Sequence, residues 1–545
     1  MTATEPKRLV IGAVLILVAA GLMPAIFLIL SHFGLPFGLG IVPMGEDYNW
    51  LIILSGQGLS QKAQNFWAMN DRNPLSPWWY IAAERLYARL PNGPYLTRLL
   101  MQPVLGLSAY AMILSVTGGR AFGLALAVGM ACALGVYAGG IDQIHWNFLG
   151  AMALSMLCIA AFAMWLNSDR RQVGWYGAAL FLWYCAFASY SFQVGAIVGI
   201  AVLSLLARPE PKASVWRRLW SSAVEIGPFA ALLLAFILAW RTTQHPAFFG
   251  YYILQPSLLL KNLPDSLAAG LSFARYKPFA DAALAEFPIL TRTLALLIGG
   301  ATVTLFVLLR AGVNRSGNAL LVLVVAFGLV IPTTLIESMS LTWGVGMRWP
   351  MVDQAWQPLL WLGLAALIVA ILPIGERPRR FGYAVLSGLA LAALVATSLG
   401  YNRVQIRYAQ AESVLSSGLK QAAAETPSGP ISLIVLVQPH APLSVPDVMA
   451  DRVSRIWFPG RDVGLRILVQ NAQPAEPTHE AWWRVVFGED QIDNVKVGGG
   501  TSDYSALRVF RFDGQTLTPL TALNAADIEG YPALWRRHTP LLLAR

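Results

Sequence analysis

Two acidic residues after the first apolar run offer the clearest chemistry in the sequence. Glu46 and Asp47 lie in the segment Gly45–Trp50, shortly after an apolar run at 9–30. A carboxylate in a cavity at the membrane boundary can take a proton from a hydroxyl group and act as a general base. Asp47 is the candidate for this role. The alternative is that both acids are solvated in a loop or cap a helix over Tyr48–Leu54.

An isolated arginine offers a second chemistry. Arg348 interrupts the stretch Leu341–Pro350 and is the only Lys or Arg in the short connection at about 338–354. A guanidinium forms bidentate, charge-assisted hydrogen bonds with phosphate, so we predict that Arg348 binds a lipid phosphate. The same position also suits an interfacial side chain with its charge in water, or an ion-pair partner of Glu337 or Asp353.

A short connection at about 140–145 places Asp142 close to His145. This pair offers a second acid or a polar contact for a substrate, and the alternative is two solvated residues in a tight loop. A metal site would need further ligands at suitable spacing, and the sequence offers none. It also has no Walker loop, dinucleotide fingerprint, His-Glu-x-x-His motif or serine-nucleophile elbow. We therefore predict no metal and no cofactor.

The composition indicates which elements position these residues. Of the 545 residues, 56% are hydrophobic and 12% are charged, whereas a soluble globular protein has roughly 25% charged residues. This composition excludes a soluble globular fold, and it also excludes disorder, because disordered chains are poor in apolar residues. The remaining class is a polytopic membrane protein. The net charge of +10 is then explained by cytoplasmic loops rather than by a nucleic-acid partner.

Long apolar runs predict about eleven transmembrane helices. The runs lie at about 9–30, 99–117, 121–139, 146–166, 174–189, 192–207, 220–240, 290–310, 318–337, 355–374 and 382–400. Lys and Arg concentrate in alternate connections, which places the N-terminus in the cytoplasm and the C-terminus outside. We therefore expect a multi-pass protein of a bacterial inner membrane, with long outside loops at about 31–98 and 241–289.

The composition changes at about residue 401 to that of a soluble domain. The run Ile431–Val437 is β-branched and apolar, which is typical of a buried strand. Polar and apolar residues alternate over Ala506–Phe512, which predicts a second strand. We therefore expect a transmembrane domain over 1–400, followed by an extracytoplasmic α/β domain over 401–545.

Three stretches of the sequence carry a family resemblance. They are Asp47 in the first outside loop, Asn70–Tyr80 with its continuation Leu90–Arg98, and Gly346–Pro350 before a long apolar run. Together they resemble the GT-C superfamily of glycosyltransferases that use polyprenyl-phosphate sugars, such as protein mannosyltransferases and lipid A aminoarabinose transferases. In that family the second stretch forms a helix, a short turn and an arginine at the start of the second span.

The resemblance implies an inverting glycosyltransferase with a GT-C-like fold. Asp47 would deprotonate an acceptor hydroxyl, which attacks the sugar of a polyprenyl-phosphate donor, and Arg348 would stabilise the phosphate that leaves. The acceptor would be an extracytoplasmic glycan, lipid or protein, and the membrane lipid would surround the donor's tail. Further side chains that could contact the substrate are Glu46, Tyr48, Trp78, Tyr80, Asp142 and His145.

Two other classes of function remain open. A lipid or glycan transporter, or a flippase, would need ionisable residues in the middle of its spans. The predicted spans are almost free of charge at their centres, and Glu225 lies only about one turn into its span. A non-catalytic scaffold with the GT-C architecture would keep the spans while losing one or two carboxylates.

Overall fold

The computed structural model describes most of the chain and divides it into two compact units. The described residues are 5–37, 58–69, 73–89, 100–135, 146–190, 193, 195–206, 214–243, 256–271, 273, 276–312, 316–339, 349–426, 429–443, 450–470, 484–487, 491–495, 501–503, 507–531, 534–536 and 541–542. The first unit takes the described residues up to Arg403, and the second takes those from Val404 onward.

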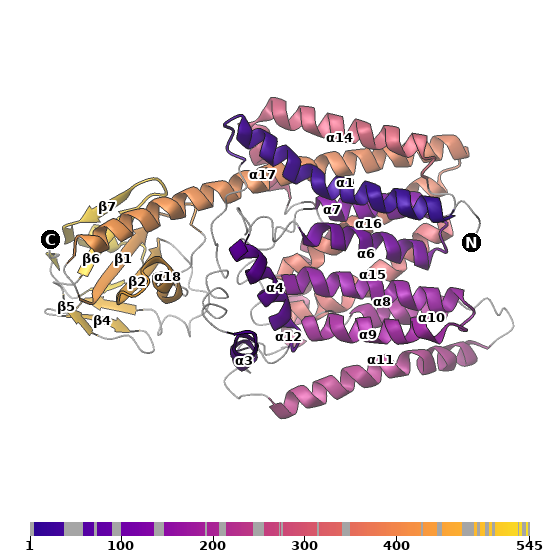
Figure 1. The fold of residues 1–545 in the computed structure, drawn as a ribbon, viewed down its shortest axis with the longest axis horizontal. Coiled ribbons are helices and arrows are strands. Elements are labelled where there is room, and N and C mark those ends of the chain that lie inside the picture. Colours follow the sequence, from indigo (N-terminus) through magenta and orange to yellow (C-terminus); the bar gives the residue numbers. More distant parts are fainter. Residues whose placement is uncertain are drawn as a thin grey trace. The chain divides into compact units, whose positions relative to one another are not determined.

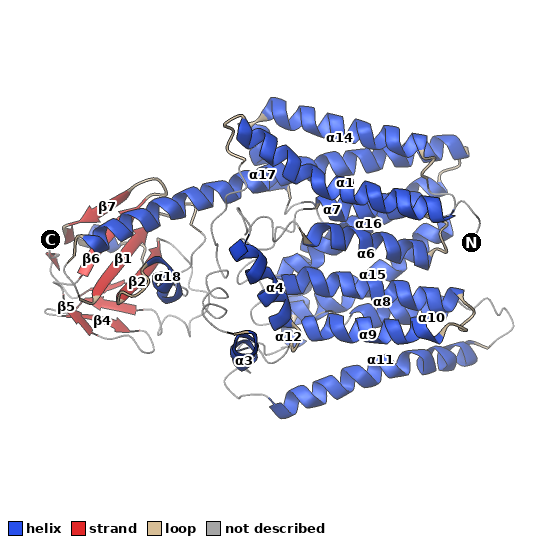
Figure 2. Cartoon of the chain, in the orientation of Figure 1, coloured by secondary structure: helices blue, strands red, loops and turns tan. Residues whose placement is uncertain are grey.

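Helices make up the described part of the first unit (Figures 1 and 2). They are α1 (Glu5–His32), α3 (Leu59–Met69), α4 (Ser76–Arg89), α6 (Met101–Val116), α7 (Phe122–Leu134), α8 (Trp146–Asn167), α9 (Val173–Ser189), α10 (Gly195–Leu206), α11 (Val215–Thr243), α12 (Pro256–Leu271), α13 (Lys277–Glu286), α14 (Pro288–Leu308), α15 (Ser316–Ser338), α16 (Trp349–Ile371) and the beginning of α17 (Glu376–Ala424). Each of the predicted apolar runs overlaps one of α1, α6 to α11 or α14 to α17. Their helical conformation is therefore confirmed.

Length separates these apolar helices into two groups. Within the described residues, 5 are long and apolar enough to cross a membrane: Arg8–His32, Phe148–Asn167, Val215–Ala239, Pro288–Leu308 and Glu376–Ala424. The described apolar stretches of the others have 10–17 residues, such as Ser316–Pro332 of α15, and α7 as a whole has only 13 residues. A helix of that length spans about 20 Å of a hydrocarbon core about 30 Å thick. The rest of the run predicted for α7, at 136–139, lies outside the described residues.

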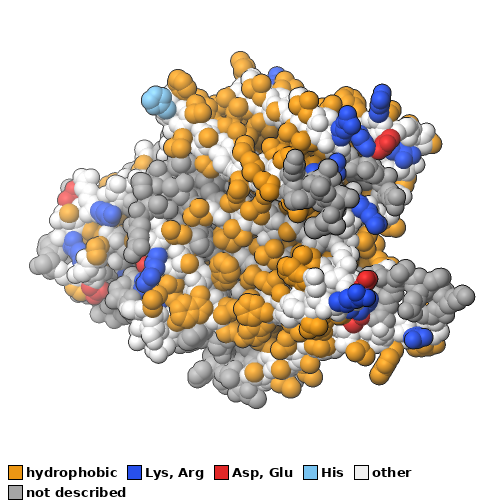
Figure 3. Space-filling view, turned by 45° about the vertical axis from the view of Figure 1, so that its right-hand side comes forward, with side chains coloured by type: hydrophobic (Ala, Val, Ile, Leu, Met, Phe, Trp, Pro, Cys, Tyr) orange, Lys and Arg blue, Asp and Glu red, His pale blue; other side chains and the backbone are white. Residues whose placement is uncertain are grey.

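Apolar side chains cover the periphery of the first unit. Only 11% of the most apolar window of α11 and 22% of that of α14 is buried, against 78% for α8. Leu234 on α11 is 57% exposed and Leu296 on α14 is 76% exposed. Figure 3 shows hydrophobic side chains across this surface. Contact of such a surface with water is unfavourable, whereas hydrocarbon suits it, so the unit has the surface of a helical membrane protein.

The second unit combines strands with a few helices. They are the end of α17, β1 (Ile431–Val437), α18 (Ala450–Trp457), β2 (Val463–Val469), β3 (Arg484–Phe487), β4 (Gln491–Val495), β5 (Thr501–Asp503), β6 (Leu507–Phe512), β7 (Leu517–Leu520), β8 (Ala522–Leu523), α20 (Ala525–Ile528), β9 (Leu534–Arg536) and β10 (Leu541–Leu542). One sheet has the order β2-β1-β6-β7, with β1 parallel to β2 and β6, and another has the order β5-β4-β3-β9. The predicted strand Ile431–Val437 is confirmed with the same bounds.

The central strand β1 is buried on both faces, which explains its uninterrupted apolar sequence. On one face, Leu433 packs in a cluster with Leu419 of α17 and Trp457 of α18. On the other face, Ile434 packs in a cluster with Tyr531, which follows α20. The predicted second strand is β6, which begins at Leu507 within the described residues.

Close contacts between helices of the first unit depend on glycine. A Cβ on Gly106 of α6 would lie 2.6 Å from the backbone oxygen of Gly129 on α7 and 2.9 Å from the side chain of Ile16 on α1. A Cβ on Gly195 of α10 would lie 2.1 Å from the backbone oxygen of Leu329 on α15. In lipid, helices associate by close packing rather than by the hydrophobic effect, and small residues permit that approach.

Substitution of Gly106 tests this packing. We expect Gly106→Ala to destabilise the protein by about 1–3 kcal/mol, because the added methyl group has to displace α7 or α1. The measurement is thermal unfolding of the detergent-purified protein, followed by tryptophan fluorescence. Gly21→Ala on α1 is the matched control, since nothing lies within 4 Å of a Cβ there. A Gly106→Ala protein that melts at or above the wild-type temperature would contradict the packing described above.

Candidate functional site

Most of the side chains predicted to carry the chemistry lie outside the described residues. The described ranges leave out 38–57, 136–145 and 340–348. These segments contain Glu46, Asp47, Tyr48, Asp142, His145 and Arg348. Their roles therefore stay predictions. The described residues show which helices carry these segments, and they include two predicted substrate contacts, Trp78 and Tyr80.

The described part of the second family stretch forms α4. The chain turns before this helix, where the amide of Ser76 donates to the carbonyl of Asn73 at 2.9 Å. The amide of Leu75 donates to the carbonyl of Ala188 near the end of α9, at 3.0 Å. Pro77 lies in the first turn of α4. Backbone N–H groups in this turn have no acceptor within the helix, so the N–H group that proline lacks costs no hydrogen bond. The helix predicted by the resemblance is therefore present over Ser76–Arg89.

Trp79 fixes α4 against the ends of two apolar helices. Its indole Nε1 donates to Ser189 Oγ of α9 at 2.9 Å. Its ring also covers Gly150 of α8, where a Cβ would lie 2.8 Å from the indole. The neighbouring aromatic residues differ in exposure, since Trp78 is 45% exposed and Tyr80 is 2% exposed. Of the two, Trp78 has the surface that a sugar ring could stack against.

Buried amide side chains occur at the same helix ends. We call this region the α4 end; it comprises the starts of α6 and α8 and the ends of α7 and α9. Gln102 Nε2 donates to the carbonyl of Gly135 at 2.9 Å, and Ser155 Oγ donates to Gln193 Oε1 at 3.1 Å. Gly135 is the last described residue before 136–145. The Gln102 contact therefore fixes the point from which the segment with Asp142 and His145 begins.

The end of α15 has its own polar contacts. Asn262 Nδ2 of α12 donates to the carbonyl of Ser338 at 3.1 Å, and the hydroxyl of Ser338 donates to Ser266 Oγ of α12 at 2.9 Å. The segment with Arg348 begins two residues after Ser338. Part of the predicted second outside loop is thus a helix that packs where the Arg348 segment begins.

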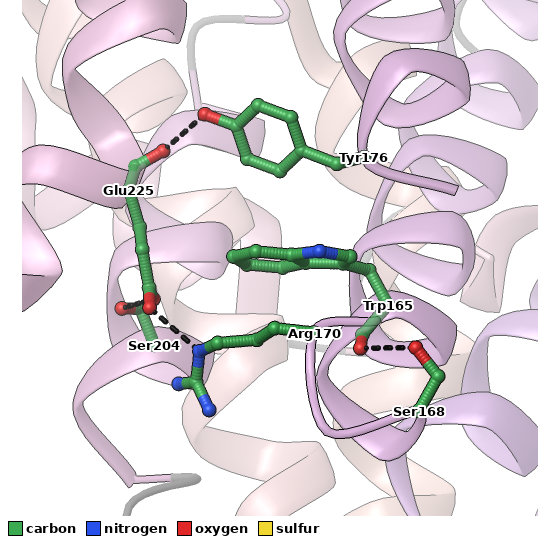
Figure 4. A network of polar contacts seen from close by, with 6 residues as sticks. All are labelled: Trp165, Ser168, Arg170, Tyr176, Ser204 and Glu225. Carbon is green, nitrogen blue, oxygen red and sulfur yellow. Dashed lines mark hydrogen bonds and ion pairs between the residues drawn. The ribbon is translucent and has the colours of Figure 1, made fainter. Parts of the chain in front are cut away.

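A polar network that sequence reasoning did not find lies at the other end of α8 (Figure 4). Arg170 Nε donates to Glu225 Oε1 of α11 at 2.8 Å, and its guanidinium lies 5.6 Å from the centroid of the Trp165 ring. The hydroxyl of Ser204 on α10 donates to Glu225 Oε2. The hydroxyl of Tyr176 on α9 donates to the backbone oxygen of Glu225 at 2.7 Å. One carboxylate residue therefore links α8, α9, α10 and α11.

This network gives Glu225 a structural role. Its side chain is 10% exposed and that of Arg170 is 34% exposed, so the carboxylate loses much of its hydration and gains a cation and a hydroxyl in return. The sequence does indicate Glu225, as an acid inside an apolar run. Its partner lies 55 residues earlier, and no local pattern predicts that pairing. A translocation pathway is not needed to explain an acid at this position.

The described residues contain no group of three or more His, Cys, Asp and Glu side chains that could hold a metal ion. Comparison of the chain with protein-family models, with curated proteins and with solved structures finds no match. The functional argument therefore rests on the residues and on the helices that position them.

Removal of Arg170 tests the network. We expect Arg170→Gln to lower the free energy of unfolding by about 1–3 kcal/mol, because the largely buried carboxylate of Glu225 loses its cation. The double variant Arg170→Gln/Glu225→Gln should recover part of that loss, since no unpaired charge remains. Chemical unfolding in detergent measures both, and Arg171→Gln, at an exposed neighbouring position, is the control. Equal stability of Arg170→Gln and the control Arg171→Gln would contradict the assigned pairing.

Proposed function

We propose that the chain is an inverting glycosyltransferase of the GT-C type, which transfers a sugar from a polyprenyl-phosphate donor to an extracytoplasmic acceptor. The position of α4 is the observation that carries the proposal. It follows the segment with Asp47, it contains the described part of the family stretch, and Trp79 holds it against α8 and α9 at the α4 end. An active site there would lie beside Trp78 of α4 and beside the connection that contains Asp142.

The proposed reaction needs one base and one cation. Asp47 accepts the proton of an acceptor hydroxyl, and the hydroxyl oxygen attacks the anomeric carbon from the face opposite the phosphate. A new C–O bond forms, the bond from that carbon to the phosphate oxygen breaks, and the configuration inverts. Polyprenyl phosphate leaves with the electron pair, and Arg348 stabilises the negative charge that develops on it. The reaction requires neither a nucleotide nor a redox cofactor.

The other predicted residues have supporting roles in this proposal. The exposed ring of Trp78 stacks on the sugar, while the buried Tyr80 supports α4 from within. Asp142 and His145, on the segment that starts after Gly135, contact the sugar or the acceptor. Glu46 and Tyr48 flank the base. The acceptor is a glycan, a lipid or a protein of the cell envelope.

The membrane topology is part of the proposal. Eleven helices cross a bacterial inner membrane, with the N-terminus in the cytoplasm and both the α4 end and the C-terminal domain outside. The distribution of charge supports this orientation, because arginines concentrate at the opposite ends of the same helices, as at Arg120, Arg170 and Arg310.

Neutralising Asp47 tests the catalytic role. We expect Asp47→Asn to lower the rate of sugar transfer by at least about 100-fold, because general-base catalysis contributes roughly 10²–10⁴-fold. The measurement is sugar transfer from a polyprenyl-phosphate donor by the purified, reconstituted protein. Asp265→Asn, at an exposed position on α12, is the control for a lost carboxylate. Wild-type transfer by Asp47→Asn would remove the assigned base and leave a transporter or a scaffold as the explanation.

Replacement of Arg348 tests the donor site separately. We expect Arg348→Ala to raise the KM for the donor by about tenfold or more, since a charge-assisted hydrogen bond to phosphate is lost. The KM for the acceptor should change much less. Steady-state kinetics with each substrate varied in turn distinguishes the two effects. An unchanged dependence on donor concentration would place Arg348 outside the site.

Reporter fusions test the topology. We expect alkaline phosphatase fused after Arg545 to be active and green fluorescent protein at the same position to be dark, because the odd number of crossings puts the C-terminus outside. A reporter inserted after Arg171 should give the opposite pattern. Activity of both phosphatase fusions, or of neither, would contradict the proposed crossings.

A further inference from the structure

Four arginines line one pocket at the end of the helices opposite the α4 end. The pocket has a volume of about 190 Å³ and is lined by Arg8, Arg120, Phe122, Arg310, Ala311, Gly312 and Arg380. The four cations come from the start of α1, the turn between α6 and α7, the turn after α14 and the first turns of α17. The positive-inside rule predicts arginines in these connections, but it does not require them to converge on a single cavity.

The pocket has an excess of positive charge among the described residues. Arg380 pairs with Glu376 one turn earlier, and no described carboxylate pairs with the other three arginines of the pocket. The guanidinium of Arg8 instead lies 5.7 Å from the centroid of the Phe122 ring. Like charges in one partly enclosed site repel each other, so an anion with more than one negative charge would be stabilised there.

Arg310 occupies a backbone position that glycine usually takes. Arg310 has a φ of 50° and ends α14 in a Schellman turn, with the amide of Ala311 on the carbonyl of Phe306 at 2.8 Å. Glycine normally occupies such a position, because a side chain is strained there. The equivalent turn after α6 has Gly118, with a φ of 57°. Backbone strain of this kind persists only where the surrounding structure fixes it, and such positions cluster at functional sites.

Two glycines allow the turn after α14 to pack closely against Arg380 and α7. A Cβ on Gly312 would lie 2.4 Å from Cγ of Arg380, and a Cβ on Gly123 of α7 would lie 2.6 Å from the amide nitrogen of Gly312. The turn after α14 can therefore nest between the start of α7 and the stem of Arg380. This close packing gives the pocket a wall of fixed shape.

Exposed apolar residues lie close in sequence to the arginines of the pocket. They indicate an anion that also has an apolar part. Val10 near Arg8 is 63% exposed, Leu308 near Arg310 is 75% exposed, and Phe381 beside Arg380 is 57% exposed. Figure 3 shows Lys and Arg side chains gathered at an end of the helical unit, beyond its apolar surface. A ligand with a phosphate head and an apolar tail matches both features, since basic pockets between membrane helices bind anionic headgroups.

We infer that the four-arginine pocket binds the headgroup of a lipid that carries more than one phosphate charge. Guanidinium groups from four segments bind the phosphate oxygens, and the acyl chains lie along α1 and α14. A bound lipid would thereby join the ends of α1, α6, α14 and α17. This site is separate from the proposed transfer site, and the inference does not depend on glycosyl transfer.

Native mass spectrometry of the full chain in neutral detergent tests the inference. The probes are cardiolipin, which has two phosphates, and phosphatidylcholine, which has no net charge. We expect cardiolipin to bind at least about tenfold more tightly than phosphatidylcholine, and Arg120→Gln/Arg310→Gly to weaken cardiolipin binding by about tenfold or more. Arg171→Gln, which removes a cation at the same end but outside the pocket, should bind as the wild type does. Equal binding of cardiolipin by the double variant and by Arg171→Gln would overturn the site.

Arg310→Gly separates loss of the site from loss of the fold. Glycine relieves the backbone strain at φ 50°, so the lipid-free variant should melt at or above the wild-type temperature. Cardiolipin should raise the melting temperature of the wild type and raise that of the variant much less. An equal rise in both proteins would overturn the role of Arg310. Pyrophosphate that displaces cardiolipin and stabilises the protein as strongly would show a soluble phosphate ligand and overturn the lipid assignment.

Discussion

The cost of taking an ionised side chain out of water governs the arrangement of this molecule. With 12% charged residues, the chain keeps the centres of its long apolar helices almost free of charge and places its charges at their ends, in the amphipathic helices and in the second unit. An acid that does enter an apolar helix, such as Glu225, is paired with Arg170 and bonded to Ser204. Because of the same cost, a charge at a helix end that has no partner in the protein suggests a ligand of opposite charge.

The two ends of the helical unit differ in chemistry for this reason. At the α4 end, the buried amide of Gln102 holds the start of a connection without adding charge. The opposite end has arginines, of which Arg310 occupies a strained backbone position. Guanidinium groups suit a phosphate, so the opposite end suits the proposed lipid headgroup. The proposed transfer reaction depends instead on Asp47 and Arg348, whose segments begin at the α4 end.

The sequence predicts the positions of the apolar helices and of the strand Ile431–Val437, because hydrophobic runs and β-branched content are local properties. Within the described residues 5 helices are long enough to cross a membrane, against the eleven predicted, and the run that contains α7 continues at 136–139, outside those residues. The sequence does not predict the pairing of Arg170 with Glu225 or the convergence of Arg8 and Arg380, because those contacts join segments far apart in the chain. The catalytic role of Asp47 is predicted from its position after the first apolar run and from the resemblance, and this residue lies outside the described residues.

Turnover of the donor by the purified wild-type chain tests the central claim most directly. The protein is reconstituted in vesicles with a polyprenyl-phosphate sugar and an extract of cell-envelope acceptors, and the lipid products are followed by mass spectrometry. The account predicts release of polyprenyl phosphate in step with glycosylation of the acceptor, with inversion at the anomeric carbon and without added nucleotide. Unchanged donor, or donor moved across the bilayer without cleavage, would contradict it.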